Sequence, residues 1–426
     1  VMTGSYLLAS CGSESDGDDT TVASGDNSAE ATTAEVSAFD SLPAEDYDGY
    51  TFKVYLNNQD DRYVDMMTEG EETGDIFNDL IYLRNLAVED KYNITFEFAE
   101  DDYNLLISTA RESVMAGDEP WDLYFANCYA APLAAEGYCY EMNSLPNVDL
   151  SNPWWDPAAL EGMSVGGKNY IVTGDISPTS LLTSSCMVFN KRLLDESGIE
   201  YPYQSVRDGT WTLESLASIT ADLTRDVNGD GSYTLGDDVF GYTSWMCDSP
   251  YSFFYGAGGT LSAKDENDIP YVDYDIEKIT NIYEYVYRII VTNNSYFVTD
   301  ANLYETFAQC FNDGGAYFSE ITLQKIELFL RDMQDDFGII PIPKYDEAQD
   351  EYLSCVNGAG GFIFVPANAS DPARTGMIVE ALAAGAYDNV TPELYDVITK
   401  TKNVRDEESA EMVDLIIKNR VFDPYY

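Results

Sequence analysis

The first structured region of the chain alternates strand-like and helix-like segments, and this order limits the possible folds more than any other feature. Residues 50–56 (YTFKVYL), 93–99 (NITFEFA) and 121–127 (WDLYFAN) have the apolar and β-branched composition of strands. Residues 75–92 and 103–117 between them have apolar side chains at helical spacing. Strands and helices in this order form right-handed crossovers and a largely parallel sheet. We therefore predict an α/β fold.

In such a sheet the ligand site lies beyond the carboxyl ends of the parallel strands. The first predicted strand is followed by Asn57, Asn58 and Gln59, and the third ends at Asn127, with Tyr129 shortly after. These side chains are amides and an aromatic ring, and none of them is a typical catalytic base. The sequence therefore favours a binding edge over a catalytic one.

The length and charge of the chain limit its organisation and its partners. The chain has 426 residues, more than a single core usually organises, so we expect two lobes. Its 76 acidic residues outnumber 22 basic ones, which gives a formal net charge of −54. Such a surface repels nucleic acid and anionic lipid, and it does not steer phosphorylated or carboxylated ligands towards the protein. A neutral partner fits this charge best, and no nucleic-acid partner is expected.

Histidine is absent from the sequence. This excludes Ser-His-Asp and Cys-His nucleophiles, as well as zinc or iron sites with His ligands. Catalysis by a pair of carboxylates remains open. With 76 acidic residues, however, two neighbouring carboxylates are expected by chance, so such a pair would say little about function.

The N-terminal residues predict an exported lipoprotein. Residues 1–11 resemble the end of a lipoprotein signal peptide without its charged region, and LASC at residues 8–11 has the form of a lipobox, which would leave Cys11 as the acylated first residue. The alternative is a chance LASC sequence. Residues 12–45 are rich in Ser, Thr, Ala, Asp and Glu, and we expect a disordered acidic tether. This predicts an extracytoplasmic protein held at the cell membrane by its lipid anchor only.

Outside the predicted signal peptide, no apolar run of the sequence is long enough to cross a bilayer. Six further cysteines follow no compact disulfide framework, so disulfide bonds and buried free thiols both remain open. They are Cys128, Cys139, Cys186, Cys247, Cys310 and Cys355.

A calcium-loop pattern lies between residues 226 and 237. Oxygen-bearing side chains occupy positions 1, 3, 5, 7, 9 and 12 of an EF-hand-type loop, with Gly231 at the sharp turn of position 6. These six are Asp226, Asn228, Asp230, Ser232, Thr234 and Asp237. The last position departs from the pattern, because Asp237 replaces the usual bidentate Glu. We predict bound Ca²⁺, and the alternative is an Asx-rich turn without metal.

The flanks of this loop indicate its role. Residues 213–223 have one apolar helical face with Thr212 as a suitable N-cap, whereas residues 239–245 have the composition of a strand. A regulatory EF-hand needs two helices whose angle can change. One helix and one strand instead favour a structural brace, and the sequence contains no second DxNxDG motif.

Several segments, taken in order, resemble the family 1 extracellular solute-binding lipoproteins of carbohydrate ABC transporters. They are GGKNYIVTGDI from residue 166, MVFNKRLLDESGIEYPYQSVRDGTWTLESLASITADLTRDVNGDG from 187, FGYTSW from 240, GAGGTL from 256 and DDFGIIPIPKYDEAQDEYLSCVNGAGGFIFVP from 335. The resemblance covers about residue 50 to the end of the chain.

The resemblance implies a two-lobed fold of the type II periplasmic-binding-protein kind, in which lobes of discontinuous sequence are joined by hinge crossovers. By analogy, the crossovers lie near residues 178–184 and 354–362. Lobe 1 would comprise residues 46–178 plus about 360–395, and lobe 2 residues 179–359 plus about 396–426. Because the family usually continues further, we expect a C-terminal part of lobe 2 to be missing.

The same resemblance implies a carbohydrate bound between the lobes. A pyranose has an apolar C–H face that stacks on aromatic rings and a rim of hydroxyls that suits amides and carboxylates. The implied ligand-binding residues are Asn127, Tyr129, Asp175, Trp245, Tyr255, Tyr317 and Glu320. Packing inside the protein is the alternative for each aromatic residue.

We therefore expect a substrate-binding protein that captures a neutral sugar or oligosaccharide and delivers it to the permease of an ABC transporter, without breaking a bond. The main alternative is a secreted lipoprotein glycoside hydrolase that uses two carboxylates. A calcium-dependent adhesion module is a third possibility, although it would need a second loop.

Overall fold

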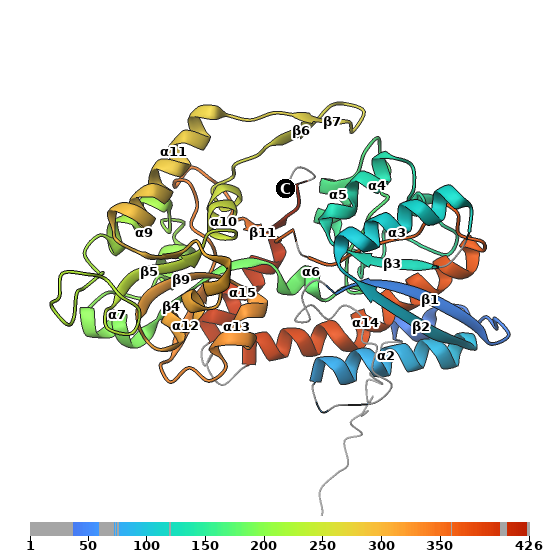
Figure 1. Cartoon of the computed structure of the whole chain (residues 1–426), viewed down its shortest axis with the longest axis horizontal. Coiled ribbons are helices and arrows are strands. Elements are labelled where there is room, and N and C mark those ends of the chain that lie inside the picture. Colours follow the sequence, from blue (N-terminus) through green and yellow to red (C-terminus); the bar gives the residue numbers. More distant parts are fainter. Residues whose placement is uncertain are drawn as a thin grey trace, which may run out of the picture. The chain divides into compact units, whose positions relative to one another are not determined.

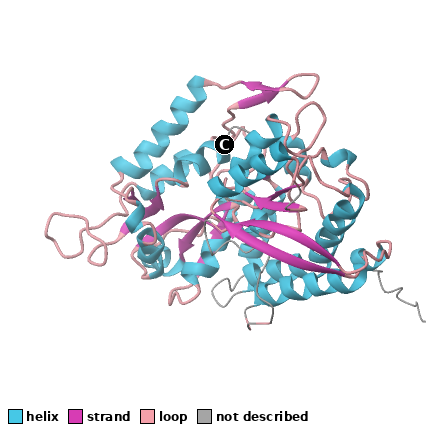
Figure 2. Cartoon of the chain, turned by 45° about the vertical axis from the view of Figure 1, so that its right-hand side comes forward, coloured by secondary structure: helices cyan, strands magenta, loops and turns pink. Residues whose placement is uncertain are grey.

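The computed structural model describes residues 37–58, 72, 74, 76–118, 121–358, 360–400 and 407–423. The predicted signal-peptide segment 1–11 with Cys11, and residues 12–36 of the predicted tether, lie outside these residues. From Ser37 onwards the chain forms one compact unit. It contains two main sheets with helices around them, coloured along the chain in Figure 1 and by secondary structure in Figure 2. The predicted α/β class is confirmed.

Lobe 1 is built on a four-stranded sheet with the order β12-β3-β1-β2. Its strands are β1 (Tyr50–Asn57), β2 (Ile94–Asp101), β3 (Leu123–Ala126) and β12 (Phe362–Phe364). β1 pairs in parallel with β2 and β3, whereas β12 runs antiparallel to β3. The predicted helices α2 (Ile76–Tyr92) and α3 (Tyr103–Ala116) connect the parallel strands, so the predicted strand–helix alternation is confirmed.

Local signals explain where the elements of lobe 1 begin and end. The Asp102 carboxylate accepts hydrogen bonds from N–H groups in the first turn of α3. The helix ends at Gly117, whose φ of 72° suits a residue without a side chain. Phe52 and Val54 alternate with less buried residues along β1 and pack against Leu382 of a long C-terminal helix. The smaller elements of this lobe are α1 (Ala38–Ser41), η1 (Cys128–Ala130), α4 (Ala131–Ala135), η2 (Met142–Ser144) and α5 (Pro157–Met163).

Lobe 2 contains a five-stranded sheet with the order β10-β4-β9-β5-β8. Its strands are β4 (Ser185–Asn190), β5 (Phe240–Trp245), β8 (Tyr296–Val298), β9 (Ala316–Thr322) and β10 (Phe337–Ile340). β5 runs parallel to β8 and β9, whereas β4 runs antiparallel to β9 and β10. Every residue of β4, β5, β9 and β10 is buried, so this sheet is covered on both faces.

The helices of lobe 2 pack around this sheet. They are α7 (Lys191–Ser197), α8 (Tyr203–Arg207), α9 (Leu213–Thr220), α10 (Ser249–Gly256), α11 (Ile276–Tyr287), α12 (Thr306–Asn312), α13 (Leu323–Leu330) and α15 (Glu407–Lys418), with η3 (Arg288–Thr292) and η4 (Ala301–Leu303). Thr212 caps α9 through the N–H of Ser215, as predicted. The chain then passes through the loop at 226–238 into β5, which confirms the helix, loop and strand order.

The segments that cross between the lobes lie next to each other. The first contains α6 (Thr179–Leu182), and the second contains β11 (Ser354–Cys355). The N–H of Asn357 donates to the C=O of Thr183 at 3.1 Å, and β11 pairs in parallel with β13 (Arg420–Val421). The long helix α14 (Pro372–Lys400) contacts both cores, because Leu382 packs in lobe 1 and Leu394 packs among residues of lobe 2.

The predicted tether at 12–45 is too long at its C-terminal end. Ser37 caps the short helix α1, which is docked on α14. One carboxylate, that of Asp388, accepts hydrogen bonds from the Ser37 hydroxyl (2.7 Å) and from the N–H groups of Ala38 (3.1 Å) and Phe39 (2.8 Å). These N–H groups have no acceptor within so short a helix, so Asp388 supplies the partner that fixes this segment.

Candidate functional site

The carboxyl end of β3 presents an exposed tyrosine on a fixed turn. Asn127 is buried, and its side-chain oxygen accepts a hydrogen bond from the N–H of Tyr129 at 3.2 Å, which caps η1. The Tyr129 side chain is 51% exposed and packs against Tyr103 of α3 with a ring-centroid distance of 5.2 Å. The sequence predicted Asn127 and Tyr129 as neighbours at this edge, and the structure places them together with Asn127 positioning the turn.

Tyr129 faces lobe 2. Burial raises the pKa of its phenol, and the nearby groups that raise it further include Cys247 and Tyr251 of lobe 2. Tyr251 lies on α10 and is 45% exposed, and Met246 and Cys247, which follow β5, are also exposed. We call Tyr103, Tyr129, Met246, Cys247 and Tyr251 the facing cluster. Its members follow strands of both lobes, and within it Tyr103 and Tyr129 are in ring contact.

Trp245 is placed differently from the prediction. The residue ends β5, but its side chain is only 8% exposed and packs with Phe307 and edge-to-face on Tyr304 at 5.3 Å. The Lys325 ammonium lies 5.2 Å from the same Tyr304 ring. The indole is thus enclosed within lobe 2, and ligand contact by Trp245 stays a prediction.

Tyr255 and Tyr317 are both buried in the core of lobe 2. Tyr255 packs edge-to-face on its neighbour Phe254 in α10. The hydroxyl of Tyr317 pairs with the Ser197 hydroxyl at 2.7 Å and accepts a hydrogen bond from Arg225 at 3.0 Å, next to the predicted calcium loop. Both rings pack within lobe 2, and ligand contact by Tyr255 or Tyr317 stays a prediction.

Glu320 is a buried acid at the carboxyl end of β9. It is 1% exposed, and its Oε1 accepts a hydrogen bond from the Ser252 hydroxyl of α10 at 2.7 Å. Its Oε2 has no hydrogen-bond partner among the described residues. Burial and then the nearby Asp248 carboxylate raise the pKa of Glu320 to about 8, although Lys325 opposes this. The shift favours the protonated acid, and a protonated carboxyl can donate a hydrogen bond.

A buried ion pair lies near Glu320 and makes a hydrogen bond to the hinge. The Lys325 ammonium pairs with the carboxylate of Asp248, the residue that precedes α10. The other oxygen of Asp248 accepts a hydrogen bond from the side chain of Asn357 at 2.8 Å, and Asn357 belongs to the second crossing segment. The second crossing segment is thus hydrogen-bonded to the buried ion pair of lobe 2. It is also hydrogen-bonded to lobe 1, because the N–H of Cys128 donates to the C=O of Gly358 at 3.2 Å.

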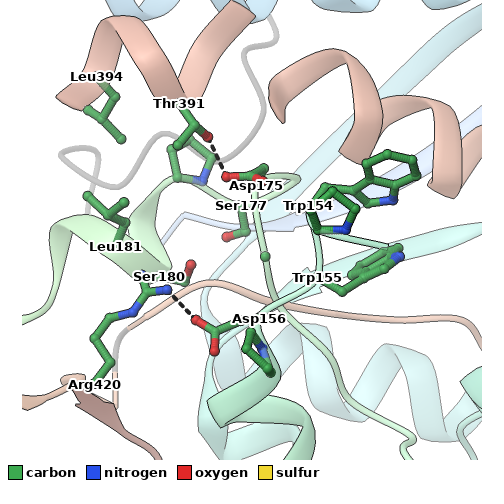
Figure 3. A pocket seen from close by; sticks show the side chains of 14 residues that line it. Trp154, Trp155, Asp156, Asp175, Ser177, Ser180, Leu181, Thr391, Leu394 and Arg420 are labelled. Atoms are coloured by element: carbon green, nitrogen blue, oxygen red, sulfur yellow. Dashed lines mark hydrogen bonds and ion pairs between the residues drawn. The ribbon is translucent and has the colours of Figure 1, made fainter. Parts of the chain in front are cut away.

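Asp175 lines a separate pocket of about 90 Å³ where the first crossing, α14 and β13 meet (Figure 3). Its carboxylate accepts a hydrogen bond from Thr391 of α14 at 2.6 Å, and burial raises its pKa to about 6. Arg420 pairs with Asp156 on the other side of the pocket (Figure 3). The described lining includes none of the other predicted ligand residues, so Asp175 belongs to the hinge.

The loop at 226–238 folds on itself through its own carboxylates. Both oxygens of Asp226 accept hydrogen bonds from N–H groups of the turn, at 2.6 and 2.8 Å. At the other end Asp238, and not the predicted Asp237, folds back and accepts from the N–H groups of Val227 and Thr234, both at 2.8 Å. Within the described residues, no group of three or more acidic or cysteine side chains is arranged to hold a metal ion. Bound Ca²⁺ in this loop stays a prediction.

The sequence model of one protein family, the bacterial extracellular solute-binding proteins, matches residues 87–412 of the chain. The match covers well over half of the sequence. The chain belongs to this family. The predicted recognition is thereby confirmed, and with it the assignment to binding proteins. A search of curated proteins finds no match.

Solved structures of binding proteins have the same two-lobed fold. UspC of M. tuberculosis superposes with a TM-score of 0.58 at 14% identity, over 88% of this chain and 90% of UspC. The GacH receptor of Streptomyces glaucescens, solved without ligand and with acarbose, gives 0.56 at 14% identity, over 88% of each chain. MalX from Streptococcus pneumoniae, solved with maltopentaose, gives 0.52 at 16% identity, over 88% of this chain and 89% of MalX. The predicted two-lobed fold is confirmed.

Among the helices that the structure describes, none combines the length and the apolar character needed to cross a membrane. Buried free thiols occur at Cys139, Cys186, Cys310 and Cys355.

Sequence reasoning missed Tyr103, Met246 and Tyr251. Tyr251 lies four residues before the predicted Tyr255 in the same helix, so helical spacing alone does not distinguish the two. Exposure separates the two, and exposure depends on how α10 packs in lobe 2.

Proposed function

We propose that this solute-binding protein captures a neutral sugar or oligosaccharide between its lobes and delivers it to the permease of an ABC transporter. The single observation that carries the proposal is the facing cluster, in which half-exposed tyrosines follow a strand of each lobe, Tyr129 shortly after β3 and Tyr251 in the helix after β5. The acarbose and maltopentaose complexes of GacH and MalX give further support, because those proteins share this fold.

The chemistry of the facing cluster suits a sugar. The Tyr129 and Tyr251 rings offer apolar faces for the C–H surface of a pyranose, and their hydroxyls can exchange hydrogen bonds with sugar hydroxyls. The net charge of −54 opposes capture of anionic ligands. A neutral glycan is therefore the ligand class that both the rings and the charge favour.

A thermal-shift screen against neutral glycans, with maltotetraose and acarbose among them, tests the proposal, because a ligand that binds only the folded protein raises its melting temperature. For a glycan that binds, Tyr129→Ala should weaken affinity by about tenfold or more, since a stacked ring contributes over 1 kcal/mol. Tyr287→Ala, at an exposed tyrosine of α11, is the matched control. Indifference to every glycan would refute sugar capture.

We also propose that Cys11 is acylated and anchors the protein outside the cytoplasm, which would keep the captured sugar near the transporter. The support is the lipobox of the sequence and the solute-binding family. The alternative, a glycoside hydrolase, can be tested with the same purified protein. Turnover of a chromogenic glycoside that is lost on Glu320→Gln would favour an enzyme.

A further inference from the structure

A β-hairpin arm extends from lobe 2 towards lobe 1. It consists of β6 (Ser262–Lys264) and β7 (Pro270–Val272), which pair antiparallel, and a turn at 265–269. The arm leaves the core of lobe 2 at Leu261 and returns to it through α11. Figure 1 shows it at the top of the view, reaching from α11 towards α5.

The tip of the arm is bound by a glycine turn of lobe 1. Gly166 and Gly167 have φ values of 63° and 71°, a conformation that glycine adopts without strain. Their consecutive N–H groups donate to the arm residue Asp268, Gly166 to its C=O at 2.8 Å and Gly167 to its carboxylate at 2.9 Å. Two successive N–H groups of this turn therefore bind the same arm residue, one through its C=O and one through its carboxylate.

A lysine of the arm makes a second set of contacts with lobe 1. The Lys264 ammonium donates to the hydroxyl of Ser164 at 2.7 Å and to the C=O of Glu161, at the end of α5. The same ammonium lies 3.0 Å from the Asp268 carboxylate. Asp268 and Lys264 therefore hold each other in the positions that lobe 1 recognises.

The segment after β13 supports the base of the arm from the side of the hinge. Asp423 accepts a hydrogen bond from the Ser262 hydroxyl at 3.2 Å. Its neighbour Phe422 packs edge-to-face on Phe362 of lobe 1, at 6.0 Å between ring centroids. The arm is thus connected to lobe 1 at its tip and, through this segment, near its base.

We propose that the β6–β7 arm is a latch that holds the two lobes closed, with Asp268 as its main positioning residue. The proposal deepens the proposed function, because it assigns what sets the closing equilibrium of the same binding protein. The contacts of Asp268 and Lys264 join surfaces that a hinge motion separates, so they exist only while the lobes are closed. An interaction made in one state alone shifts the population towards that state.

The expected effect follows from these contacts. A hydrogen bond to a charged group is among the stronger ones in a protein, but the Asp268 side chain is 29% exposed, and solvent weakens its contacts. Loss of the carboxylate should therefore shift the closing equilibrium about three- to tenfold towards the open form. Ligand affinity should fall by up to the same factor, because it follows the fraction of the protein in the closed form.

The test compares Asp268→Gly with Glu266→Gly in the full chain. Glycine suits the positive φ of residue 268 (61°), and Glu266 is an exposed acid of the same turn, so the control removes the same charge. Without ligand, Asp268→Gly should speed hydrogen exchange of the amides at 166–167 about three- to tenfold and increase the radius of gyration in X-ray scattering. Glu266→Gly should match the wild type in both measurements.

Unchanged hydrogen exchange at 166–167 would show that the contact with Asp268 is not made in solution. Faster exchange without a larger radius of gyration would show that this contact does not hold the lobes closed. Either result overturns the latch. Lys264→Gln should reproduce the scattering change without altering the turn residue. These measurements need no ligand. If maltotetraose binds the wild type, its affinity for Asp268→Gly should fall, by at most about tenfold. Failure of all glycans to bind would refute the proposed function and leave the latch test intact.

Discussion

Replacing Glu320 by Gln should stabilise the protein progressively as the pH rises from 5 to 8.5. The side chain is 1% exposed and lies near the Asp248 carboxylate, so ionisation inside lobe 2 is disfavoured. Gln has nearly the same shape, and its carbonyl oxygen keeps the hydrogen bond from Ser252. Any cost of burying the new amide does not depend on pH, so it drops out of the comparison between pH values.

The sign and size follow from the two states of the chain. The unfolded chain ionises Glu320 above its ordinary pKa of 4.5, whereas the folded protein keeps it protonated up to a pKa of about 8. Between these values the folded protein holds the extra proton, so its free energy of unfolding falls as the pH rises, by up to about 1.4 kcal/mol per pH unit. The Gln variant lacks this loss. Between pH 5 and pH 8.5 it should therefore gain about 4 kcal/mol relative to the wild type.

Denaturation by urea, followed by tryptophan fluorescence at pH 5.0, 6.5 and 8.5, measures this difference. The chain has no histidine, so few ordinary groups titrate in this range. Burial also raises the pKa of Glu380 to about 7 and that of Asp175 to about 6, but these groups are common to both proteins and cancel. Glu266→Gln, at an exposed position, is the control. A stability gap that stays the same at all three pH values would refute the reasoning.

Three other outcomes are expected. Trp245→Ala should lower the free energy of unfolding by about 3–5 kcal/mol, because it leaves a cavity beside Tyr304 and Phe307. Chemical denaturation measures this loss. Full stability combined with lost sugar binding would instead support stacking of Trp245 on the ligand. If the loop at 226–238 binds calcium, Ca²⁺ restored after EGTA should raise the melting temperature, and Asp226→Ala with Asp230→Ala should abolish the rise; a melting temperature indifferent to Ca²⁺ would leave a turn without metal. With its full signal peptide, Cys11→Ala should release the protein from the detergent phase, and a variant that stays there at unchanged mass would contradict anchoring.

The elements that sequence predicted best are those fixed by local signals. The strand at 50–57 and the helix that Asp102 caps depend on residues within one or two turns of each other. The segment at 37–41 was assigned to the tether because its composition is mostly polar. Its structure depends on Asp388, about 350 residues later in the sequence, which accepts its free N–H groups. Composition contains no information about such a distant acceptor, so the end of the tether could not be placed from sequence.

The candidate site shows the same limit at the level of single side chains. The exposed edge at Asn127 and Tyr129 was predictable, because parallel strands direct their carboxyl ends to one edge. The exposure of the aromatic residues of lobe 2 was not predictable from the sequence. Every residue of β5 and β9 is buried, so strand alternation does not separate inner from outer faces. Within α10, Tyr251 and Tyr255 have helical spacing that places them on one side, yet Gly256 packs closely on Ile342 and draws that end of the helix into the core. Tyr255 is enclosed there, whereas Tyr251, one turn earlier, remains 45% exposed.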